Sequence, residues 1–439
     1  MGLGDPGSQP PEIFTEVPGP ASLRYSTALE ELEAPGINTI YRGRPSLLWQ
    51  EALGSNVVDV DGNRFVDLTA GFGVAGIGHR HPKVVEALAR QGHSLIHGLG
   101  DVMAHPQRVE LCRRLRDLVP VRDRTSAQTH LAVSGADALE IAAKTAILHH
   151  RSLNRPRQSF LVFDPAYHGL SLGALALTSR DEFRNPFLPH LHPHIERRPF
   201  GGSLRKVAQL LEEGRVAAAV VEPVVGREGV RPAPDGWLAE LAELCRRTET
   251  ILIADEIFTG FGRTGRLFAV EHQLSIDDGS LPDLVCCGKA LAGGLPIGAV
   301  VGRRQLMAAW STSGEAIHTG TFVGHPLACA TANATLEVVT KSDEPLAQRA
   351  ARLGEGVAKR LASWPARFEE VESIRGLGLL WGIVLRDSDT AAGWSAKARS
   401  RGILLLAGGP EGRVAQLVPP LTIDRDLLHL SLDLLEECF

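Results

Sequence analysis

The chain has 439 residues, of which 44% are hydrophobic, and its 46 basic and 51 acidic residues give a formal net charge of -5. A chain of this length can bury a large core, and we expect one large α/β domain with a smaller second domain. The charge is too small and too evenly spread to favour a nucleic acid or a membrane surface as partner. We therefore expect small-molecule substrates and further copies of the same chain.

The cysteines and the first residues bear on the cellular compartment. The six cysteines form no Cys-x-x-Cys pair and lie mostly among apolar residues, as expected of free thiols in a reducing compartment. The first residues contain neither a basic nor an apolar targeting region, and Pro6 stands where a myristoylation signal requires Ser or Thr. No apolar run is long enough to span a bilayer. The sequence predicts a cytoplasmic protein.

The start of the chain is predicted to join the smaller domain. Residues 1–20 are rich in Gly, Pro and Ser, which predicts a flexible tail. Residues 49–65 alternate apolar and polar side chains around a turn, which indicates an antiparallel hairpin. The remaining assignments are an N-terminal segment of the small domain (21–75), a large domain (76–324) and the C-terminal part of the small domain (325–439).

From about residue 83, helix-length amphipathic segments alternate with short apolar runs. Helices are predicted over residues 84–95, 108–118, 327–339 and 347–361, and strands over residues 129–133, 159–163, 217–221, 251–254, 284–287, 378–385 and 414–417. The alternation predicts a mostly parallel sheet with helices on both faces. Ligands in such folds bind at the carboxyl ends of the strands, so the residues that follow each run are candidates for a site.

Two of the predicted strands lead into groups that could hold a flat, anionic ligand. Ser134 and Gly135 begin a helix whose first N–H groups form an anion cradle, although an ordinary capped helix start is the commoner explanation. Tyr167 and His168 follow the next strand and offer a flat ring, but an aromatic side chain beside a turn is more often a packing contact.

Two further strands end on charged groups. Asp255 closes a buried apolar run, where a carboxylate needs a cation, an internal partner or a helix cap to offset its burial. Lys289 follows another run among small residues; burial would make its amine nucleophilic, whereas a lone lysine after a strand is usually solvated. One cofactor uses all four groups. Pyridoxal 5'-phosphate has a phosphate, a flat ring, a pyridine nitrogen that stays protonated and an aldehyde that a lysine holds as an imine.

At these residues the sequence strongly resembles the class III (omega) aminotransferases, pyridoxal-phosphate enzymes of fold type I that include 4-aminobutyrate and ornithine aminotransferases. The resemblance covers roughly residues 35–430. It rests on motifs in the same order: Asp59-Val-Asp-Gly-Asn-Arg-Phe-Val-Asp67, Gly78-His-Arg-His-Pro82, Ser134-Gly-Ala-Asp-Ala138, Tyr167-His-Gly169, Glu222-Pro-Val224, Asp255-Glu-Ile257, Gly260-Phe-Gly-Arg-Thr-Gly265, Gly288-Lys-Ala-Leu-Ala-Gly-Gly294, His318-Thr-Gly-Thr-Phe322 and Arg375-Gly-Leu-Gly378.

The resemblance implies a role for each of these residues. Lys289 would form the imine with the cofactor and Asp255 would bond the pyridinium nitrogen. The other cofactor contacts would be Tyr167 and Ile257 on opposite ring faces, Ser134, Gly135 and Ala136 at the phosphate, and His168 and Glu222 beside the ring. Thr321 would reach the phosphate of the neighbouring subunit, which implies an obligate homodimer with its sites at the interface.

The chain departs from the family pattern in the cofactor site. Ala136 offers only its backbone N–H where many members have Thr or Ser, which removes a hydroxyl contact of about 1 kcal/mol. Phe258 stands where the aminobutyrate and ornithine enzymes carry Gln, and it cannot hydrogen-bond the phenolic oxygen of the cofactor. Together with Arg227 and Gln416, it is a candidate substrate contact.

The substrate pocket also departs from those relatives. Arg227 and Gln416 occupy the positions of a glutamate and an arginine that, in those relatives, pair with each other and switch to receive the α-carboxylate of glutamate. Either Arg227 takes over carboxylate recognition as a bidentate fork, or it lies at the surface beside a neutral pocket for amines. Ile147 stands near the expected position of a carboxylate-binding arginine, which disfavours 4-aminobutyrate as substrate.

The sequence therefore predicts a ping-pong aminotransferase that moves an amino group, expected to be a terminal one, from an amine or amino acid to an oxo acid or aldehyde. The alternatives are an amino-acid racemase or epimerase, a decarboxylase or an aminomutase of the same family, and a non-catalytic binding protein on the same scaffold. The alternate histidines in His190-Leu-His-Pro-His194 do not indicate a metal site, because the prolines favour a loop and no acidic partner is nearby. We expect no metal.

Overall fold

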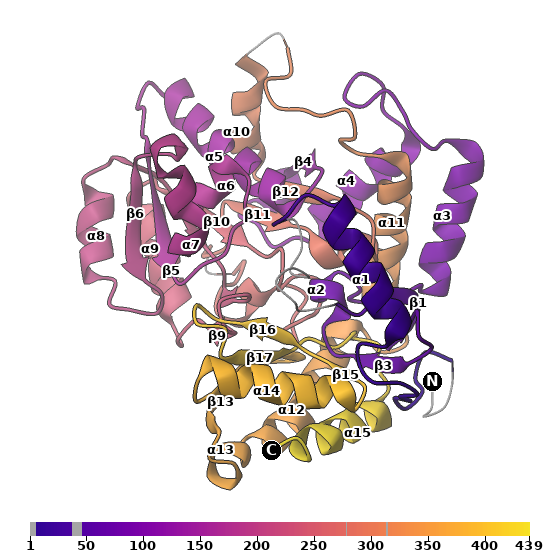
Figure 1. Ribbon diagram of the computed structural model, residues 1–439. Coiled ribbons are helices and arrows are strands. Elements are labelled where there is room, and N and C mark those ends of the chain that lie inside the picture. Colours follow the sequence, from indigo (N-terminus) through magenta and orange to yellow (C-terminus); the bar gives the residue numbers. More distant parts are fainter. Residues whose placement is uncertain (1–5, 37–45, 278, 313–314) are drawn as a thin grey trace.

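The computed structural model describes residues 6–36, 46–277, 279–312 and 315–439, and it is built around a seven-stranded sheet (Figure 1). The strands, in their order across the sheet, are β4 (Gln128–Ala132), β12 (Gly298–Gly302), β11 (Leu284–Cys287), β10 (Ile251–Asp255), β7 (Val216–Val221), β5 (Ser159–Asp164) and β6 (Ile195–Pro199). Within this sheet β12 is antiparallel to both neighbours and the other six strands are parallel. The predicted, mostly parallel sheet is confirmed.

Helices cover both faces of the sheet because its strands are apolar on both sides. Along β10, Ile251 and Ile253 belong to one buried cluster with α5 (Gly135–Ser152) and α6 (Leu172–Leu177). Leu252 and Ala254 point the other way. They share a cluster with α4 (Pro106–Leu118), α8 (Arg205–Glu212), α9 (Trp237–Arg247) and α11 (Pro326–Lys341). The core is therefore two layers with the sheet between them.

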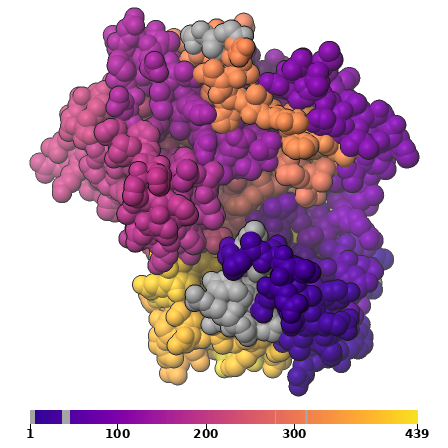
Figure 2. Space-filling model, turned by 45° about the horizontal axis from the view of Figure 1, so that its top comes forward, coloured from indigo at the N-terminus to yellow at the C-terminus, as the bar shows by residue number. Residues whose placement is uncertain are grey.

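The two ends of the chain meet in a smaller sheet. β1 (Trp49–Leu53), β2 (Asn56–Asp59) and β3 (Arg64–Asp67) form a meander, and β15 (Ile403–Leu404) adds in parallel to β3. In Figures 1 and 2 the indigo and yellow parts of the chain accordingly lie on the same side of the molecule. The hairpin predicted over residues 49–65 is thus part of a three-stranded meander completed from the C-terminal segment.

The described N-terminal residues are anchored to this meander, which corrects the expectation of a loose tail over residues 1–20. The side-chain oxygen of Asn63 accepts hydrogen bonds from the N–H groups of Phe14 (2.8 Å) and Thr15 (3.1 Å). The side-chain oxygen of Asn56 likewise accepts from the N–H of Gln9 at 2.8 Å. Composition missed these contacts because the anchoring residues lie in the meander, far along the chain. Residues 1–5 lie outside the described residues.

The C-terminal segment adds an antiparallel sheet below the large one (Figure 1). Its strands, in order, are β13 (Val371–Leu377), β14 (Leu380–Leu385), β17 (Val414–Leu417) and β16 (Leu406–Gly408). The other elements are α1 (Pro20–Leu32), α2 (Ala70–Gly73), α3 (Pro82–Ser94), α7 (Asp181–Arg184), β8 (Val224–Val225), β9 (Arg231–Pro232), α10 (Arg304–Met307), α12 (Leu346–Leu361), α13 (Trp364–Arg367), α14 (Ser388–Ser400) and α15 (Arg425–Glu436). In the described part of the chain, none of the helices has the length and apolar character to cross a membrane.

Candidate active site

The residues predicted for the cofactor site follow parallel strands that end at one edge of the large sheet. They are Ser134 after β4, Tyr167 and His168 after β5, Glu222 after β7, Asp255 at the end of β10 and Lys289 after β11. The antiparallel β12 begins at this edge, where a Cβ added to Gly298 would lie 2.3 Å from the carbonyl oxygen of Ser134. The turn into α5 therefore packs directly on the backbone of β12.

The start of α5 lies against the residues around Lys289. A Cβ added to Gly135 would lie 2.9 Å from Cγ2 of Ile257, and one added to Gly288 would lie 3.2 Å from the same atom. The Ile257 side chain thus contacts both glycines and lies between the strand ends of β4, β10 and β11. Because only glycine leaves this space free, the backbone at the helix start and the backbone before Lys289 can approach each other.

The first turn of α5 keeps its N–H groups available for an anion. Ser134 caps the helix by accepting a hydrogen bond from the N–H of Asp137 at 3.2 Å. A Cβ added to Gly169 would lie 2.7 Å from the Cβ of Ala136, so the turn after β5 packs on this first turn. A helix N-terminus with unpaired N–H groups and a positive dipole end is suited to a phosphate.

Asp255 forms a buried pair with His168. Its Oδ2 lies 2.7 Å from Nδ1 of His168, and its Oδ1 accepts a hydrogen bond from the N–H of Ile257 at 3.1 Å. Burial disfavours the imidazolium, but the hydrogen bond and the charge of Asp255 raise the pKa of His168 above 6.5. The Nε2 of His168 is buried without a hydrogen-bond partner in the described residues. The pair fixes a carboxylate at the strand end, which the sequence had identified without its histidine partner.

Glu222 holds two turns of the site together. Its Oε1 accepts a hydrogen bond from the N–H of Tyr167, and its Oε2 accepts one from the N–H of Gly226, both at 2.9 Å. Burial raises the pKa of Glu222 to about 7; the nearby charge of Asp255 acts in the same direction and that of His168 opposes it. Glu222 therefore connects the turn after β5 to the β8–β9 hairpin.

Lys289 is half-buried beside an aromatic ring. Its Nζ lies 4.1 Å from the centre of the Phe258 ring, and its backbone φ is +40°, in the left-handed region that non-glycine residues rarely adopt. Burial lowers the pKa of Lys289 to about 8, against the opposing charges of Asp255 and Glu222. The amine therefore loses its proton more readily near neutral pH than an ordinary lysine does, which favours its use as a nucleophile.

Arg227 lies in the turn of the β8–β9 hairpin with its guanidinium over the Tyr167 ring. The distance from Cζ to the ring centre is 4.6 Å. Its Nε is buried without a hydrogen-bond partner, and no carboxylate of the described residues forms an ion pair with it. The positive charge of Arg227 also lowers the pKa of Lys289, in addition to the effects of burial, Asp255 and Glu222.

Gln416 contacts the Arg227 turn through the backbone. It is buried in β17, and its Nε2 donates hydrogen bonds to the carbonyl oxygens of Gly226 (3.0 Å) and Arg227 (3.2 Å). The N–H of Gly409 donates to the same Arg227 carbonyl at 3.0 Å. The side chain predicted to contact substrate is thus occupied with positioning the hairpin turn.

A buried ion pair beside Arg227 was missed from the sequence. Glu228 is fully buried, and its Oε1 lies 2.7 Å from Nε of Arg180, whose Nη2 donates to the carbonyl oxygen of Gly409 at 2.8 Å. An acidic residue in this hairpin signalled that a cation was needed. Its partner, 48 residues earlier in the chain, could not be identified without the fold.

Two residues lie away from this edge of the sheet. Thr321 is exposed, and its carbonyl oxygen lies beside Gly100. Ile147 lies in α5 about 18 Å along the helix axis from Gly135 and packs beside Phe160. The expectation that Ile147 is near a substrate carboxylate is therefore corrected; it is a packing residue, and its identity carries no information about 4-aminobutyrate.

The residues at this edge fit pyridoxal phosphate. The start of α5 is a phosphate cradle bounded by the Ile257 side chain, and the buried carboxylate of Asp255 suits a protonated ring nitrogen. Lys289 offers an amine with a lowered pKa on the adjacent strand. A fold type I architecture with such strand ends defines the class of pyridoxal-phosphate enzymes.

Comparison with known proteins agrees with this class. The family profile of the class-III aminotransferases matches residues 40–439. The chain is 37% identical over 405 residues to the acetylornithine aminotransferase of Methanopyrus kandleri, covering 92% of this chain and 97% of that protein. It is 33% identical over 455 residues to the 4-aminobutyrate aminotransferase of Mycobacterium leprae, covering 97% of each chain. The chain belongs to the class-III aminotransferase family.

Solved structures are similar over nearly the whole chain. The ornithine aminotransferase of Toxoplasma gondii has a TM-score of 0.85 and 29% identity, covering 94% of this chain and 93% of that chain. An amine transaminase from an uncultivated Pseudomonas species, in its PLP-bound form, has a TM-score of 0.83 and 27% identity, covering 93% of this chain and 98% of that chain. The protein is a pyridoxal-phosphate-dependent aminotransferase.

Proposed function

We propose that Lys289 and Asp255 carry out the transamination, with Ser134, Gly135 and Ala136 at the cofactor phosphate. The observation that carries this proposal is the Lys289 amine, whose pKa of about 8 leaves it reactive beside the Asp255–His168 pair. Tyr167 and Ile257 would flank the cofactor ring, because both extend from strand ends next to Asp255. Glu222 and His168 would act indirectly, by fixing Tyr167 and Asp255.

Each residue then has a definite task. Pyridoxal phosphate, when bound, supplies an aldehyde carbon that accepts an amine and a ring that accepts electrons. Asp255 holds negative charge at the ring nitrogen, which favours its protonated form. Lys289 would hold the cofactor through its amine, and the same amine, once free, would move a proton at the carbon that bears the amino group. The amino group, in our proposal a terminal one, passes in a second half-reaction to an oxo acid or aldehyde.

The test is a panel of amino donors and acceptors with the purified holoenzyme. We expect a donor alone to change the visible absorbance of the bound cofactor, and an oxo acid or aldehyde to reverse the change. A protein that binds the cofactor but shows no spectral change with any donor would contradict transamination. Inversion of an amino acid without an oxo acid would instead indicate racemisation, and release of carbon dioxide would indicate decarboxylation.

We also propose that Arg227 binds a carboxylate of the substrate. Its guanidinium lies over the Tyr167 ring and has a buried Nε without a partner, so a substrate carboxylate would supply the missing acceptor. A guanidinium fork matches a carboxylate with two parallel hydrogen bonds. Relatives named for acetylornithine and 4-aminobutyrate act on compounds that carry a carboxylate, which supports the same substrate class.

The Arg227 proposal is tested by comparing substrates with and without a carboxylate. Arg227→Ala should raise KM for amino acids by on the order of tenfold to a hundredfold, as expected for a lost charge-assisted hydrogen bond. KM for an amine without a carboxylate should stay the same or fall. Arg113→Ala, at an exposed arginine on α4, is the matched control. Equal effects on both substrate types would favour the neutral amine pocket.

We further propose an obligate homodimer with the sites at its interface. Thr321 is exposed, and Phe322 beside it is 62% exposed while its ring contacts His97 at 5.5 Å. The same surface exposes the apolar side chains Ile96, Leu99, Val102 and Met103. An exposed apolar surface of this kind is suited to a second copy, which would bring Thr321 to the partner's phosphate.

Light scattering tests the dimer, with twice the chain mass expected. Met103→Glu should dissociate the dimer and weaken cofactor binding together, whereas Thr321→Ala should weaken cofactor binding and leave the mass unchanged. Thr125→Ala, at an exposed threonine in the short 3-10 helix Arg124–Ser126, is the control. A monomeric holoenzyme with full activity would overturn the proposal.

We also propose a cytoplasmic location, which is supported by six free cysteines. Fractionation of the source cells tests this location.

A further inference from the structure

A pocket of about 80 Å³ lies where the β8–β9 hairpin meets the C-terminal sheet. Arg231 begins β9, Arg375 comes from β13 and Arg413 directly precedes β17; all three line the pocket, together with Glu411. β9 contacts β13, and Figure 1 shows it beside β16 and β17. Three arginines therefore line one small space.

Arg413 is the one of the three with carboxylate partners in the described residues. It forms ion pairs with Glu372 and, at 3.0 Å, with Glu411. No carboxylate of the described residues lies at ion-pair distance from Arg231 or Arg375. The two glutamates that approach the pocket are thus both engaged by the same arginine.

The remaining two arginines line the pocket without an ion-pair partner in the described residues. The Nε of Arg231 is buried and has no hydrogen-bond partner. The Nε of Arg375 donates to the carbonyl oxygen of Gly229 at 2.7 Å, which fixes that side chain against the hairpin. Burial, with the charges of Arg231 and Arg413, lowers the pKa of Arg375 to about 10, and the charge of Glu372 opposes this only in part. Cations that are close together and partly buried are costly unless an anion pairs with them.

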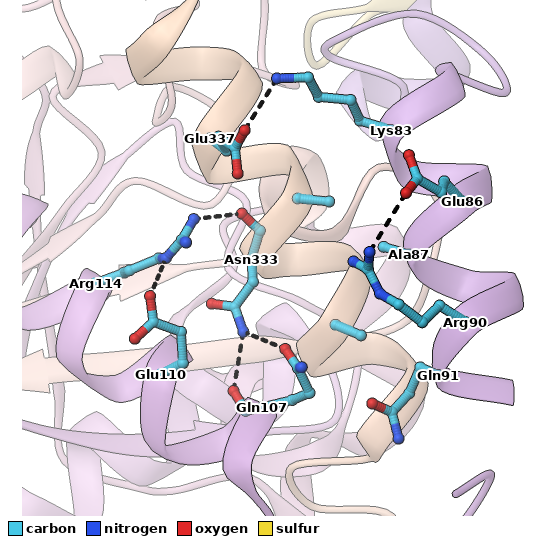
Figure 3. Close-up of a pocket in the computed structure, with 12 residues that line it drawn as sticks. Lys83, Glu86, Ala87, Arg90, Gln91, Gln107, Glu110, Arg114, Asn333 and Glu337 are labelled. Atoms are coloured by element: carbon cyan, nitrogen blue, oxygen red, sulfur yellow. Dashed lines mark hydrogen bonds and ion pairs between the residues drawn. The ribbon is translucent and has the colours of Figure 1, made fainter. Parts of the chain in front are cut away.

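The arginines and lysine of a larger charged groove elsewhere on the molecule do have carboxylate partners. In the groove between α3, α4 and α11, Arg114 pairs with Glu110, Arg90 with Glu86 and Lys83 with Glu337 (Figure 3). Each cation there has its own carboxylate, so the groove carries no unmet charge. Arg231 and Arg375 differ from these cations in that respect.

We propose that the pocket binds one small oxyanion between Arg231 and Arg375. Guanidinium groups present planar forks of donors that match carboxylate, phosphate and sulfate oxygens. The volume is well below the roughly 300 Å³ at which pockets for drug-sized ligands begin, so a single small ion fits better than a nucleotide. The bound oxyanion accepts from the free Arg231 Nε and offsets the repulsion between the two arginines.

The position of this site links it to substrate binding. Arg375 bonds the carbonyl oxygen of Gly229, two residues beyond Arg227 in the same hairpin turn, and Arg231 is the first residue of the returning strand. An oxyanion that holds Arg231 and Arg375 in place therefore also stabilises the conformation of the turn that carries Arg227. The pocket is separate from the α5 phosphate cradle, so holoenzyme with bound cofactor retains it.

Isothermal titration of the holoenzyme with inorganic phosphate, sulfate and acetate, in a zwitterionic buffer, tests the proposal. In the Arg227→Ala holoenzyme, which lacks the substrate carboxylate site proposed above, we expect saturable binding at one site per chain. Arg231→Gln and Arg375→Gln should each weaken it by on the order of tenfold or more, because each removes charge-assisted hydrogen bonds. Glu411→Gln should strengthen binding severalfold, because it removes a carboxylate from the pocket and changes only an exposed side chain. Arg113→Gln is the control.

The three ions in the titration distinguish between the possible sources of the oxyanion. Preference for phosphate or sulfate identifies a tetrahedral inorganic ion, and preference for acetate identifies an organic carboxylate; both support the site. No binding of any of the three ions by the holoenzyme overturns the proposal, as does undiminished binding by folded Arg231→Gln and Arg375→Gln. Should those two variants fail to fold, unchanged affinity in Glu411→Gln overturns it.

Discussion

The Nζ of Lys289 rests on the face of the Phe258 ring, 4.1 Å from its centre. The ring itself is tightly enclosed. A Cβ added to Gly226 would lie 2.4 Å from its Cδ1, and a Cβ added to Gly73 would lie 3.1 Å from its Cε2. The hairpin that carries Arg227 and the backbone of α2 therefore fix an aromatic surface under the reactive amine. We infer that Phe258 is in this way a positioning residue for Lys289.

Replacing Phe258 should change the acidity of Lys289. An aromatic face stabilises the ammonium form, so Phe258→Leu should lower the pKa of Lys289 in the cofactor-free protein further below about 8. The change should be less than about one pKa unit, which is equivalent to about 1.4 kcal/mol. The pH dependence of cofactor uptake by the cofactor-free protein measures it. Phe368→Leu, at a ring stacked on Phe439, is the control; a pKa that is unchanged or higher in Phe258→Leu would contradict this role.

The wild-type protein should take up pyridoxal phosphate faster as the pH rises through about 8, because the unprotonated amine of Lys289 is the nucleophile. Lys289→Ala should lose both the visible absorbance of the bound cofactor and the turnover while keeping its far-ultraviolet circular dichroism. Lys206→Ala, at an exposed lysine on α8, should behave like the wild type. Turnover in Lys289→Ala would require another residue to hold the cofactor.

The strand-end residues were predictable from sequence for a physical reason. Asp255 and Lys289 each follow a short apolar run directly, and parallel strands bring their carboxyl ends to one edge of the sheet. Knowing the order of the strands was not necessary for this step. The position of the chemistry therefore follows from local pattern together with one rule of topology.

The contacts between those residues and distant segments were not predictable. Gln416 bonds the carbonyl oxygen of Gly226, 190 residues away in the chain, and its amide gives no sequence signal of that partner. β12 was missed because Gly298–Gly302 is short and rich in glycine, although its antiparallel pairing with β4 and β11 completes the sheet. Ile147 was misassigned because distance along a helix was not considered. Such errors arise where the site depends on contacts between residues that are far apart in the sequence.

Gln416 offers a test of how the Arg227 turn is positioned. Gln416→Leu removes the donor to the carbonyl oxygens of Gly226 and Arg227, so it should cost about 1–3 kcal/mol of stability. It should also raise KM for amino acids severalfold, with little effect on amines that lack a carboxylate. Gln91→Leu, at a half-buried position in α3, is the control.

The double variant separates positioning from general damage. In the Arg227→Ala background, the effect of Gln416→Leu on KM should vanish, because the two substitutions then act on the same lost contact. Steady-state kinetics of the wild type, both single variants and the double variant provide the cycle. Additive effects on KM would show that Gln416 does not act through Arg227.

Glu256, next to Asp255, should make stability depend on pH. Burial raises its pKa from 4.5 to about 7, and its carboxylate accepts hydrogen bonds from the N–H of Val270 (2.7 Å) and the hydroxyl of Thr259. Between these two pH values the folded protein binds more protons at this site than the unfolded protein does. The stability that protonated Glu256 contributes is therefore fully present below pH 4.5 and is lost as the pH rises through about 7.

Glu256→Gln should remove this dependence while keeping both contacts, because an amide accepts from Val270 and donates to Thr259. Between pH 4.5 and about 7, the stability of the wild type relative to the variant should fall by on the order of 3 kcal/mol. Denaturation midpoints across this range measure it. Glu243→Gln should show the opposite sign, because hydrogen bonding to Arg246 lowers the pKa of exposed Glu243 and its stabilisation is lost as the pH falls. Parallel curves for the wild type and Glu256→Gln would mean that Glu256 titrates normally in the fold.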